Sequence, residues 1–294
     1  MKRLLFIINP KAGKGLLRTR LLDVITMFTK KEYEVIVHPT RFEKDAFNKV
    51  IEYNTNIDIV VCAGGDGTLD EVVSGMVKCG CKHPLGYIPT GSTNDFASSL
   101  GLSKNILHAA RTIMKGKLFS CDIGRFNQDS FVYIAAFGLF TDVAYETNQD
   151  LKNILGHLAY MLEGMKKIFD VKSYEMNVKT EQQEYNGDYI YGMVTNSISV
   201  GGFKNLIGAE VDLSDGLFEI TLIRRPKNPI ELQEIISALL LAEDNTELIH
   251  TFKAASLDLV SETKVPWTLD GEYGGKHKEV QIRNMHKVLE IFTD

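Results

Sequence analysis

Three glycines and an aspartate form the stretch of this sequence best suited to chemistry. Gly64, Gly65 and Gly67 surround Asp66, and Thr68 follows. The run at 58–63 predicts a buried strand, and residues 68–77 predict a helix. Glycines at a strand-to-helix turn leave backbone amides accessible beside the positive end of a helix dipole. That arrangement suits a phosphate group.

Asp66 needs an explanation of its own, because a carboxylate repels phosphate. It fits this turn if it meets a metal ion, a sugar hydroxyl or a reacting proton. The alternative is an ordinary glycine-rich turn with an exposed aspartate, since short glycine motifs are weak evidence by themselves.

Three further polar turns follow predicted strands in the first half of the chain. They occupy residues 9–15, Thr40 and residues 90–96. The first is rich in glycine and lysine without the spacing of a P-loop, and the third begins a helix with four N-cap residue types, Ser92, Thr93, Asn94 and Asp95. The alternation of strands and helices predicts a parallel, doubly wound sheet. Because ligands bind at the carboxyl ends of such strands, we expect the turns to form one nucleotide-phosphate site.

From residue 125 onward the pattern becomes rich in strands. We therefore expect an α/β protein with two domains. Residues 1–124 would form a doubly wound parallel-sheet nucleotide-binding domain, and residues 125–294 an antiparallel β-sandwich-like domain whose last strand is free to return to the first domain. The predicted strands of the second half are 131–137, 174–179, 189–195, 218–223, 256–260, 268–270, 280–283 and 288–292, with helices at 151–169 and 229–242.

Composition excludes several classes of protein. The chain has 294 residues, 44% apolar and 24% charged, which is typical of a soluble globular protein. A net charge of −5 argues against nucleic-acid binding. No stretch reaches the ~18 apolar residues of a membrane span. The four cysteines lack zinc or redox spacing, so we expect a cytoplasmic protein.

The segment 153–169 predicts an amphipathic helix with methionines on its apolar side. It would either face the core or form an adaptable wall that admits an acyl chain. Lys166, Lys167 and Lys172 near it are candidates for membrane contact, although a solvated helix face is the favoured explanation.

Five motifs in order carry a family resemblance. They are Asn9-Pro10 with Gly13, the GGDGT run at 64–68 with Glu71, PTGSTNDFA at 89–97, LSDGL at 213–217 and LDGE at 269–272. Together they resemble the bacterial diacylglycerol kinase family, soluble lipid kinases related to sphingosine kinases and more distantly to NAD kinases.

The resemblance implies an ATP- and Mg²⁺-dependent kinase that transfers the γ-phosphate to a lipid hydroxyl, with the conversion of diacylglycerol to phosphatidic acid as the favoured reaction. The sequence does not choose between diacylglycerol and the other lipid alcohols, which are monoacylglycerol, phosphatidylglycerol, sphingoid bases and an undecaprenyl-type alcohol. It implies a structural magnesium site at Asp212, Asp215 and the carbonyl of Leu217. The residues expected to bind ATP are Asn9, Pro10, Lys11, Ala12, Gly13, Thr40, Gly64, Gly65, Asp66, Gly67, Thr68, Glu71 and Ser92.

The expected catalytic residues are Glu272, Asp66, Asp270 and Asp95. Glu272 is the base that the resemblance implies, accepting the lipid hydroxyl proton. Asp270, two residues earlier on an extended strand, would point to the same side as Glu272, and the pair would either raise the pKa of one carboxyl group or share a proton. A hairpin turn is the alternative for residues 270–272.

Two other functions compete with the lipid kinase. The first is an NAD kinase, against which the late LDGE motif counts. The second is a nucleotide sensor on the same scaffold, which would bind ATP without turnover. As partners we expect a lipid substrate at the membrane surface, reached by transient peripheral contact, and no nucleic acid. A homodimer through strands of the second domain is a further hypothesis.

Overall fold

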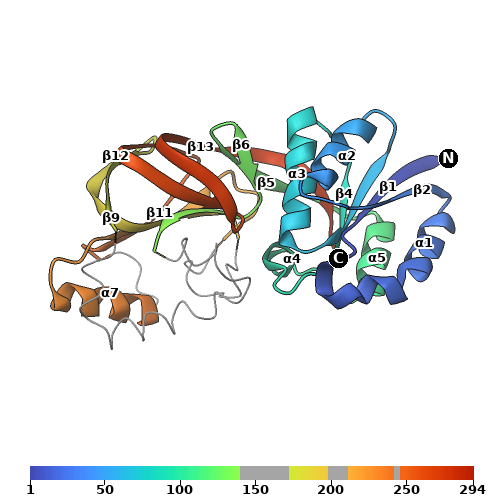
Figure 1. Ribbon diagram of the computed structural model, residues 1–294, viewed down its shortest axis with the longest axis horizontal. Coiled ribbons are helices and arrows are strands. Elements are labelled where there is room, and N and C mark those ends of the chain that lie inside the picture. The colour runs from blue at the N-terminus through green and yellow to red at the C-terminus, as the bar shows by residue number, and fades with distance from the viewer. Residues whose placement is uncertain (140–171, 198–210, 242–245) are drawn as a thin grey trace. The chain divides into compact units, whose positions relative to one another are not determined.

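The computed structural model describes residues 1–139, 172–197, 211–241 and 246–294 (Figure 1). They fall into two compact units. Unit 1 comprises Met1–Ile123 and His286–Asp294, and unit 2 comprises Gly124–Met285. The predicted helix at 151–169, with Lys166 and Lys167, lies outside the described residues.

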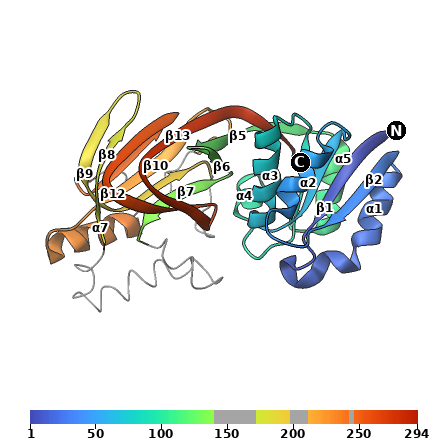
Figure 2. The same cartoon turned by 45° about the horizontal axis from the view of Figure 1, so that its top comes forward.

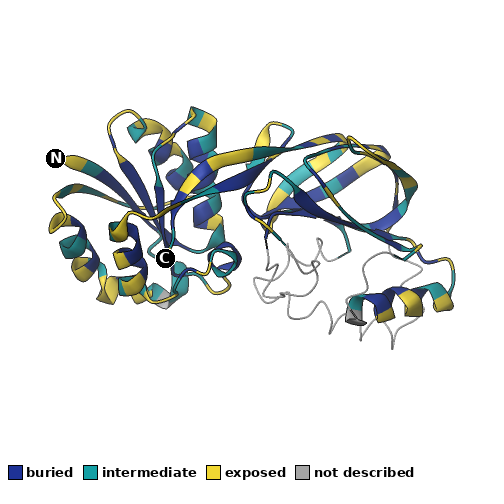
Figure 3. Ribbon diagram, turned by 180° about the vertical axis from the view of Figure 1, so that it is seen from behind, coloured by how far each residue is buried: buried dark blue, intermediate teal, exposed yellow. Residues whose placement is uncertain are grey.

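Unit 1 is built on a parallel sheet, as expected. Its order is β4-β3-β1-β2, and the end of β13 pairs in parallel with β4 through Ile291 and Leu85. The interior of β1 is fully buried on both faces, as in a parallel sheet covered on both sides (Figure 3). The strands are β1 (Lys2–Ile8), β2 (Tyr33–Pro39), β3 (Ile59–Gly64) and β4 (Leu85–Pro89).

The helices of unit 1 pack as two groups. Apolar residues of α1 and α5 form one cluster with Leu4, Phe6 and Ile8 of β1. Helices α2 and α3 pack against each other closely, since a Cβ on Gly75 would lie 2.8 Å from the Phe47 carbonyl oxygen. The helices are η1 (Ala12–Thr19, a 3₁₀ helix), α1 (Leu21–Thr29), α2 (Asp45–Tyr53), α3 (Asp66–Cys79), α4 (Asp95–Ser99) and α5 (Ile106–Lys115).

Unit 2 is rich in strands that pair in antiparallel fashion, as predicted. Strands β8 and β7 occupy the same position between β9 and β12, one after the other along the strand direction. Two strands, β5 (Leu118–Phe126) and β13 (Glu272–Phe292), run from one unit into the other. The remaining elements of unit 2 are β6 (Asp129–Phe131), β7 (Ile134–Gly138), β8 (Tyr174–Lys179), β9 (Glu184–Thr195), β10 (Phe218–Arg224), α7 (Pro229–Leu241), β11 (Ile249–Ala254) and β12 (Ser256–Leu269).

Several predicted strands in the second half have different bounds. Those at 256–260 and 268–270 belong to one strand, β12, and those at 280–283 and 288–292 belong to β13 (Figure 2). The predicted strand at 131–137 is divided between β6 and β7, and β11 was not predicted.

The core of unit 2 is aromatic at its centre. Trp267 is 1% exposed, and its ring centroid lies 5.0 Å from that of Phe126 and 4.8 Å from that of Phe137. Cys62, Cys81 and Cys121 are buried free thiols. Among the described helices, none combines the length and hydrophobicity needed to cross a bilayer.

Candidate active site

The turns after β1 and β3 of unit 1 are joined by hydrogen bonds. The Asn9 backbone amide donates to the Ala63 carbonyl at 2.8 Å, and Asn9 Nδ2 donates to Thr68 Oγ1 at 2.9 Å. The chain runs from β1 outward to β2 and then returns to β3 on the other side of β1. This reversal is the topological switch point at which open α/β sheets bind ligands.

The other two turns adjoin the same place. The Thr40 amide donates to the Ile8 carbonyl at the end of β1, and the Thr90 amide donates to the Gly64 carbonyl, both at 2.8 Å. Gly13 lies against the turn after β4, because a Cβ there would be 1.8 Å from the Thr90 carbonyl oxygen. The predicted convergence of the four turns is therefore confirmed.

Two glycines bring the turns after β3 and β4 into backbone contact. A Cβ on Gly91 would lie 2.5 Å from the Gly65 Cα, and a Cβ on Gly65 would lie 3.2 Å from the Gly91 Cα. The glycines thus have a packing role in addition to leaving amides accessible. Ser92 follows Gly91 and is exposed.

Asn94 organises the turn after β4, a role that sequence reasoning missed. Its φ of 54° places it in the left-handed region, which asparagine tolerates better than most residues. Its Oδ1 accepts a hydrogen bond from the Gly91 amide at 2.9 Å, and its Nδ2 donates to the Gly91 carbonyl at 2.7 Å. The clustering of N-cap residue types at 92–95 was the only sequence signal for this turn.

Asp66 and Asp95 are neighbouring carboxylates at the starts of α3 and α4, the helices that follow two of these turns. Desolvation, with the negative charge of Asp95, raises the pKa of Asp66 to about 6, although backbone amides at 94–96 oppose the shift. Asp66 Oδ1 is buried and has no hydrogen-bond partner in the described part of the chain. A buried carboxylate oxygen beside a second carboxylate suits a hard cation such as Mg²⁺.

Both carboxylate oxygens of Glu71 are occupied by hydrogen bonds to the backbone, which gives Glu71 a structural role beside the site. Its Oε1 accepts a hydrogen bond from the Lys44 amide at 2.8 Å, and its Oε2 accepts one from the Ala46 amide at 3.1 Å. These amides lie at the N-terminus of α2, where helices leave donors unsatisfied. Glu71 therefore ties α3 to the segment that follows β2 and carries Thr40.

The expectation that Asp270 lies on an extended strand beside Glu272 is wrong. Asp270 and Gly271 form the tight turn between β12 and β13, with φ of 50° and 87°. The Asp270 carboxylate is buried and accepts hydrogen bonds from the backbone amides of 132–134, at 2.5 Å for Val132 and 2.9 Å for the other two. These hydrogen bonds lie where β6 ends, at Phe131, and β7 begins, at Ile134.

Glu272 begins β13 in unit 2 and is exposed. It pairs with Leu269 across the turn, so the hairpin alternative for 270–272 is correct as a description of the backbone. Asp270 anchors this hairpin, and Glu272 presents its carboxylate to solvent.

The predicted metal ligands form a polar turn before β10. Asp212 Oδ1 accepts hydrogen bonds from the amide and the hydroxyl of Ser214, both at 2.9 Å. Asp215 Oδ1 accepts one from the Leu217 amide at 2.9 Å, and its Oδ2 lies 3.6 Å from the Lys253 ammonium. Within the residues described, no three His, Cys, Asp or Glu side chains cluster as a metal site. The carboxylate oxygens of this turn are ligands of the kind that Mg²⁺ prefers, and Asp215 Oδ2 already faces the Lys253 ammonium.

Sequence reasoning also missed two buried carboxylates on strands. Asp122 of β5 is fully buried and accepts hydrogen bonds from His286 Nδ1 at 3.0 Å and the Lys287 amide at 2.7 Å. Glu219 of β10 is buried beside Lys253. A charged residue inside an apolar strand was the available signal in each case.

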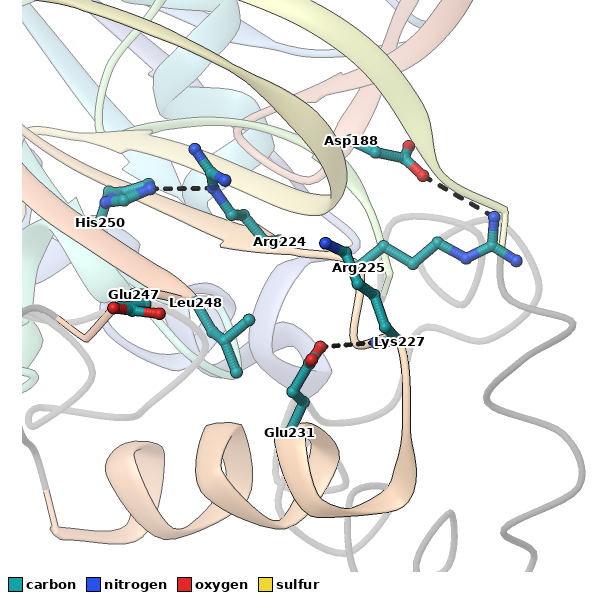
Figure 4. A pocket seen from close by; sticks show the side chains of 8 residues that line it. All are labelled: Asp188, Arg224, Arg225, Lys227, Glu231, Glu247, Leu248 and His250. Carbon is teal, nitrogen blue, oxygen red and sulfur yellow. Dashed lines mark hydrogen bonds and ion pairs between the residues drawn. The ribbon is translucent and has the colours of Figure 1, made fainter.

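Unit 2 also holds a polar cavity of about 530 Å³ beside α7 (Figure 4). Its lining carries both signs of charge, and Arg225 lies 3.7 Å from Asp188 while Arg224 donates to His250 at 3.1 Å. No predicted site residue lines it. The lining residues are Asp188, Arg224, Arg225, Lys227, Glu231, Glu247, Leu248 and His250.

The sequence and the structure were compared with those of known proteins, and the matches include the region that holds the four turns. Residues 3–126 match the diacylglycerol kinase catalytic domain, the segment that contains all four turns. The whole chain also aligns with curated relatives of that name, and it belongs to the diacylglycerol kinase family. By that membership it is an enzyme of the lipid-kinase class.

Two curated relatives and one solved structure illustrate the similarity. The diacylglycerol kinase of Bacillus subtilis is 34% identical over 94% of this chain and 91% of its own length. That of Staphylococcus saprophyticus is 32% identical over 99% of this chain and 95% of its own length. A crystal structure of a candidate diacylglycerol kinase from Bacillus anthracis superposes with a TM-score of 0.81 at 26% identity, covering 100% of this chain and 95% of the other.

Proposed function

We propose that this protein transfers the γ-phosphate of ATP to the hydroxyl of diacylglycerol, giving phosphatidic acid, with Mg²⁺ as the metal. The observation that carries the proposal is the convergence of four polar turns at the switch point of the unit 1 sheet, where Asp66 Oδ1 has no hydrogen-bond partner among the described residues. Family membership supplies the class of reaction.

The turns of unit 1 bind the triphosphate in this proposal. Backbone amides at 64–68, at the N-terminus of the 14-residue helix α3, hold phosphate oxygens. In this proposal residues 9–13 and Ser92 contact the same phosphates, and Thr40 contacts the nucleoside part of ATP. Glu71 acts as a positioning residue, because its carboxylate is already bonded to the amides of Lys44 and Ala46.

Asp66 and Asp95 would hold the magnesium ion. When bound, Mg²⁺ neutralises charge on the phosphates, which a pair of carboxylates alone would repel. The chain contributes the buried Asp66 oxygen and the neighbouring charge of Asp95 to this binding.

Glu272 would accept the proton of the lipid hydroxyl. Its carboxylate is exposed at the start of β13, as an acceptor for a substrate group requires. A carboxylate is a weak base for an alcohol in the ground state, but it suffices late in a loose transition state, when the proton has become acidic. Asp270 positions Glu272 by anchoring the hairpin and does not share its proton.

A second magnesium ion is proposed at Asp212, Asp215 and the Leu217 carbonyl, in a structural role. We further propose that the protein works in the cytoplasm and touches the membrane surface transiently to reach its lipid. Lys172, exposed with its ammonium 5.2 Å from the Tyr174 ring centroid, is the candidate contact residue that the structure describes. Homodimer formation stays a prediction.

The test supplies purified protein with γ-labelled ATP, Mg²⁺ and one acceptor at a time. The acceptors are diacylglycerol, monoacylglycerol, phosphatidylglycerol, a sphingoid base, an undecaprenyl alcohol and NAD. We expect label in the organic phase with diacylglycerol. Label in water with NAD would instead support the NAD kinase, and ATP binding without transfer to any acceptor would support the sensor.

A further inference from the structure

A buried charge in unit 2 lies outside the residues that the proposed function uses. The Glu219 side chain is only 5% exposed, and neither of its carboxylate oxygens has a hydrogen-bond partner by geometry in the described part of the chain. Its compensation is ionic, because the Lys253 ammonium lies 3.1 Å from Oε1. A buried carboxylate without a nearby cation would be strongly unfavourable.

The sheet places this ion pair by register. Glu219 of β10 stands directly opposite Lys253 of β11 in the antiparallel ladder, so both side chains lie on one face. The neighbours Phe218 and Ile220 belong to the aromatic core on the other face. The alternation of β10 therefore directs Glu219 away from that core and toward Lys253.

Lys253 also serves a second carboxylate. Its ammonium lies 3.6 Å from Asp215 Oδ2, and the other Asp215 oxygen accepts the Leu217 amide. One positive charge thus faces two negative charges. Asp215 is the same residue that the proposed function assigns to a magnesium ion.

We propose that the Lys253 ammonium is the resident cation of this cluster, and that it lowers the affinity of Asp215 for a divalent metal ion. A metal at Asp215 must approach beside an ammonium that already neutralises Oδ2, and two cations repel at that distance. Lys253 cannot simply leave, because Glu219 would then be buried without compensation. The inference rests on the proposed metal site at Asp215 and not on the lipid kinase activity.

The test measures Mn²⁺ binding to the full chain without nucleotide, by counting free Mn²⁺ with electron paramagnetic resonance. Lys253→Met keeps the length of the side chain and removes its charge. The carboxylates of Asp215 and Glu219 are then no longer opposed by the ammonium, and with Asp212 they offer the oxygen ligands that Mn²⁺ and Mg²⁺ prefer. We expect Mn²⁺ affinity to rise roughly tenfold or more.

Three variants make the result specific. Lys253→Arg keeps the charge and is expected to bind Mn²⁺ as the parent does. Lys264→Met removes an exposed lysine of β12 and is the matched control, with no expected change. Asp215→Asn in the Lys253→Met background is expected to abolish the gain.

Because Lys253→Met leaves Glu219 uncompensated, a second variant guards against loss of folding. Lys253→Met with Glu219→Gln removes both charges of the pair and still takes the ammonium from Asp215, so its Mn²⁺ affinity should also exceed that of the parent. Parental affinity in both variants, or a gain that survives Asp215→Asn, would overturn the proposal. These outcomes are independent of kinase activity, so a failed lipid assay and a failed metal assay point to different errors.

Discussion

At the scale of single residues, the two most informative carboxylates of the structure are buried for different purposes. Asp270 is satisfied by three backbone amides and holds a hairpin. Asp66 has one oxygen without a hydrogen-bond partner among the residues that the structure describes, and it lies near Asp95, which is costly for the folded protein. Costs of this kind are retained where function requires them.

Asp66→Asn is expected to stabilise the protein and to damage its activity. The pKa of Asp66 rises from 3.8 to about 6 on folding, so the folded state loses stability as pH increases from about 4 to 6 and stays penalised above that range. In EDTA, the variant should therefore gain up to about 3 kcal/mol at pH 8 and almost nothing near pH 4.

Urea denaturation at the two pH values checks this expectation, with Asp23→Asn, an exposed carboxylate of α1, as the control. The same variant should bind ATP yet transfer phosphate far more slowly than the parent. Equal stability at pH 8, or parental rate and magnesium dependence, would contradict the role given to Asp66.

Glu272→Gln and Asp270→Asn separate chemistry from scaffolding. Glu272 is exposed, so its amide variant should keep the parental unfolding midpoint while turnover falls at least ~100-fold through loss of a general base. Asp270→Asn weakens a buried acceptor of three amides and should lower stability by about 1–3 kcal/mol along with activity. Near-normal turnover in Glu272→Gln would remove Glu272 from the proposed role.

At the scale of elements, the structure predicts different consequences for two helix caps of unit 1. Glu71 satisfies amides at the start of α2 beside the site, and the Asn105 side chain accepts the His108 amide at the start of α5. Glu71→Ala and Asn105→Ala should each cost about 0.5–2 kcal/mol of stability.

Only the Glu71 variant should also weaken ATP binding, since it loosens the segment that carries Thr40. Urea denaturation of both variants measures the loss of stability, and ATP affinity measured on both shows whether binding is weakened in Glu71→Ala alone. ATP affinity that is unchanged in Glu71→Ala, or equally weakened in Asn105→Ala, would contradict the positioning role.

Much of unit 1 could be predicted from the sequence, because its strands are continuous apolar runs punctuated by glycine and cap residues. Residues 58–63 were predicted where β3 spans Ile59–Gly64. The contacts of Asn9 with Thr68, and of Asp270 with residues 132–134, could not be predicted, since their partners are distant in sequence. The ion pair of Glu219 with Lys253 could not be predicted either, because it depends on the register of β10 and β11, which places the two residues opposite each other.

At the scale of the whole molecule, the C-terminal strand belongs to the unit that begins the chain. Residues of β13 near its end pair with β4, and Ile291 is fully buried there. The Thr112 hydroxyl also donates to Asp294 Oδ1 at 2.6 Å. Unit 1 is thus completed by residues that lie far in sequence from its other strands.

Truncating the Ile291 side chain should therefore destabilise unit 1. Ile291→Ala is expected to cost about 2–5 kcal/mol of unfolding free energy, the usual cost for a fully buried aliphatic residue. Val288→Ala in the same strand is the control, because Val288 is 44% exposed and should change stability little. Equal losses in both variants would contradict the docking of this strand in the sheet of unit 1.

We propose that this enzyme phosphorylates a lipid hydroxyl with Glu272 as the proton acceptor. The most direct measurement is the fate of the γ-phosphate when purified protein meets ATP, Mg²⁺ and diacylglycerol vesicles, followed side by side for the parent and Glu272→Gln. We expect labelled phosphatidic acid from the parent and at most about one hundredth of that rate from the variant. Absence of labelled lipid from the folded, ATP-binding parent protein, or equal rates in both, would contradict it.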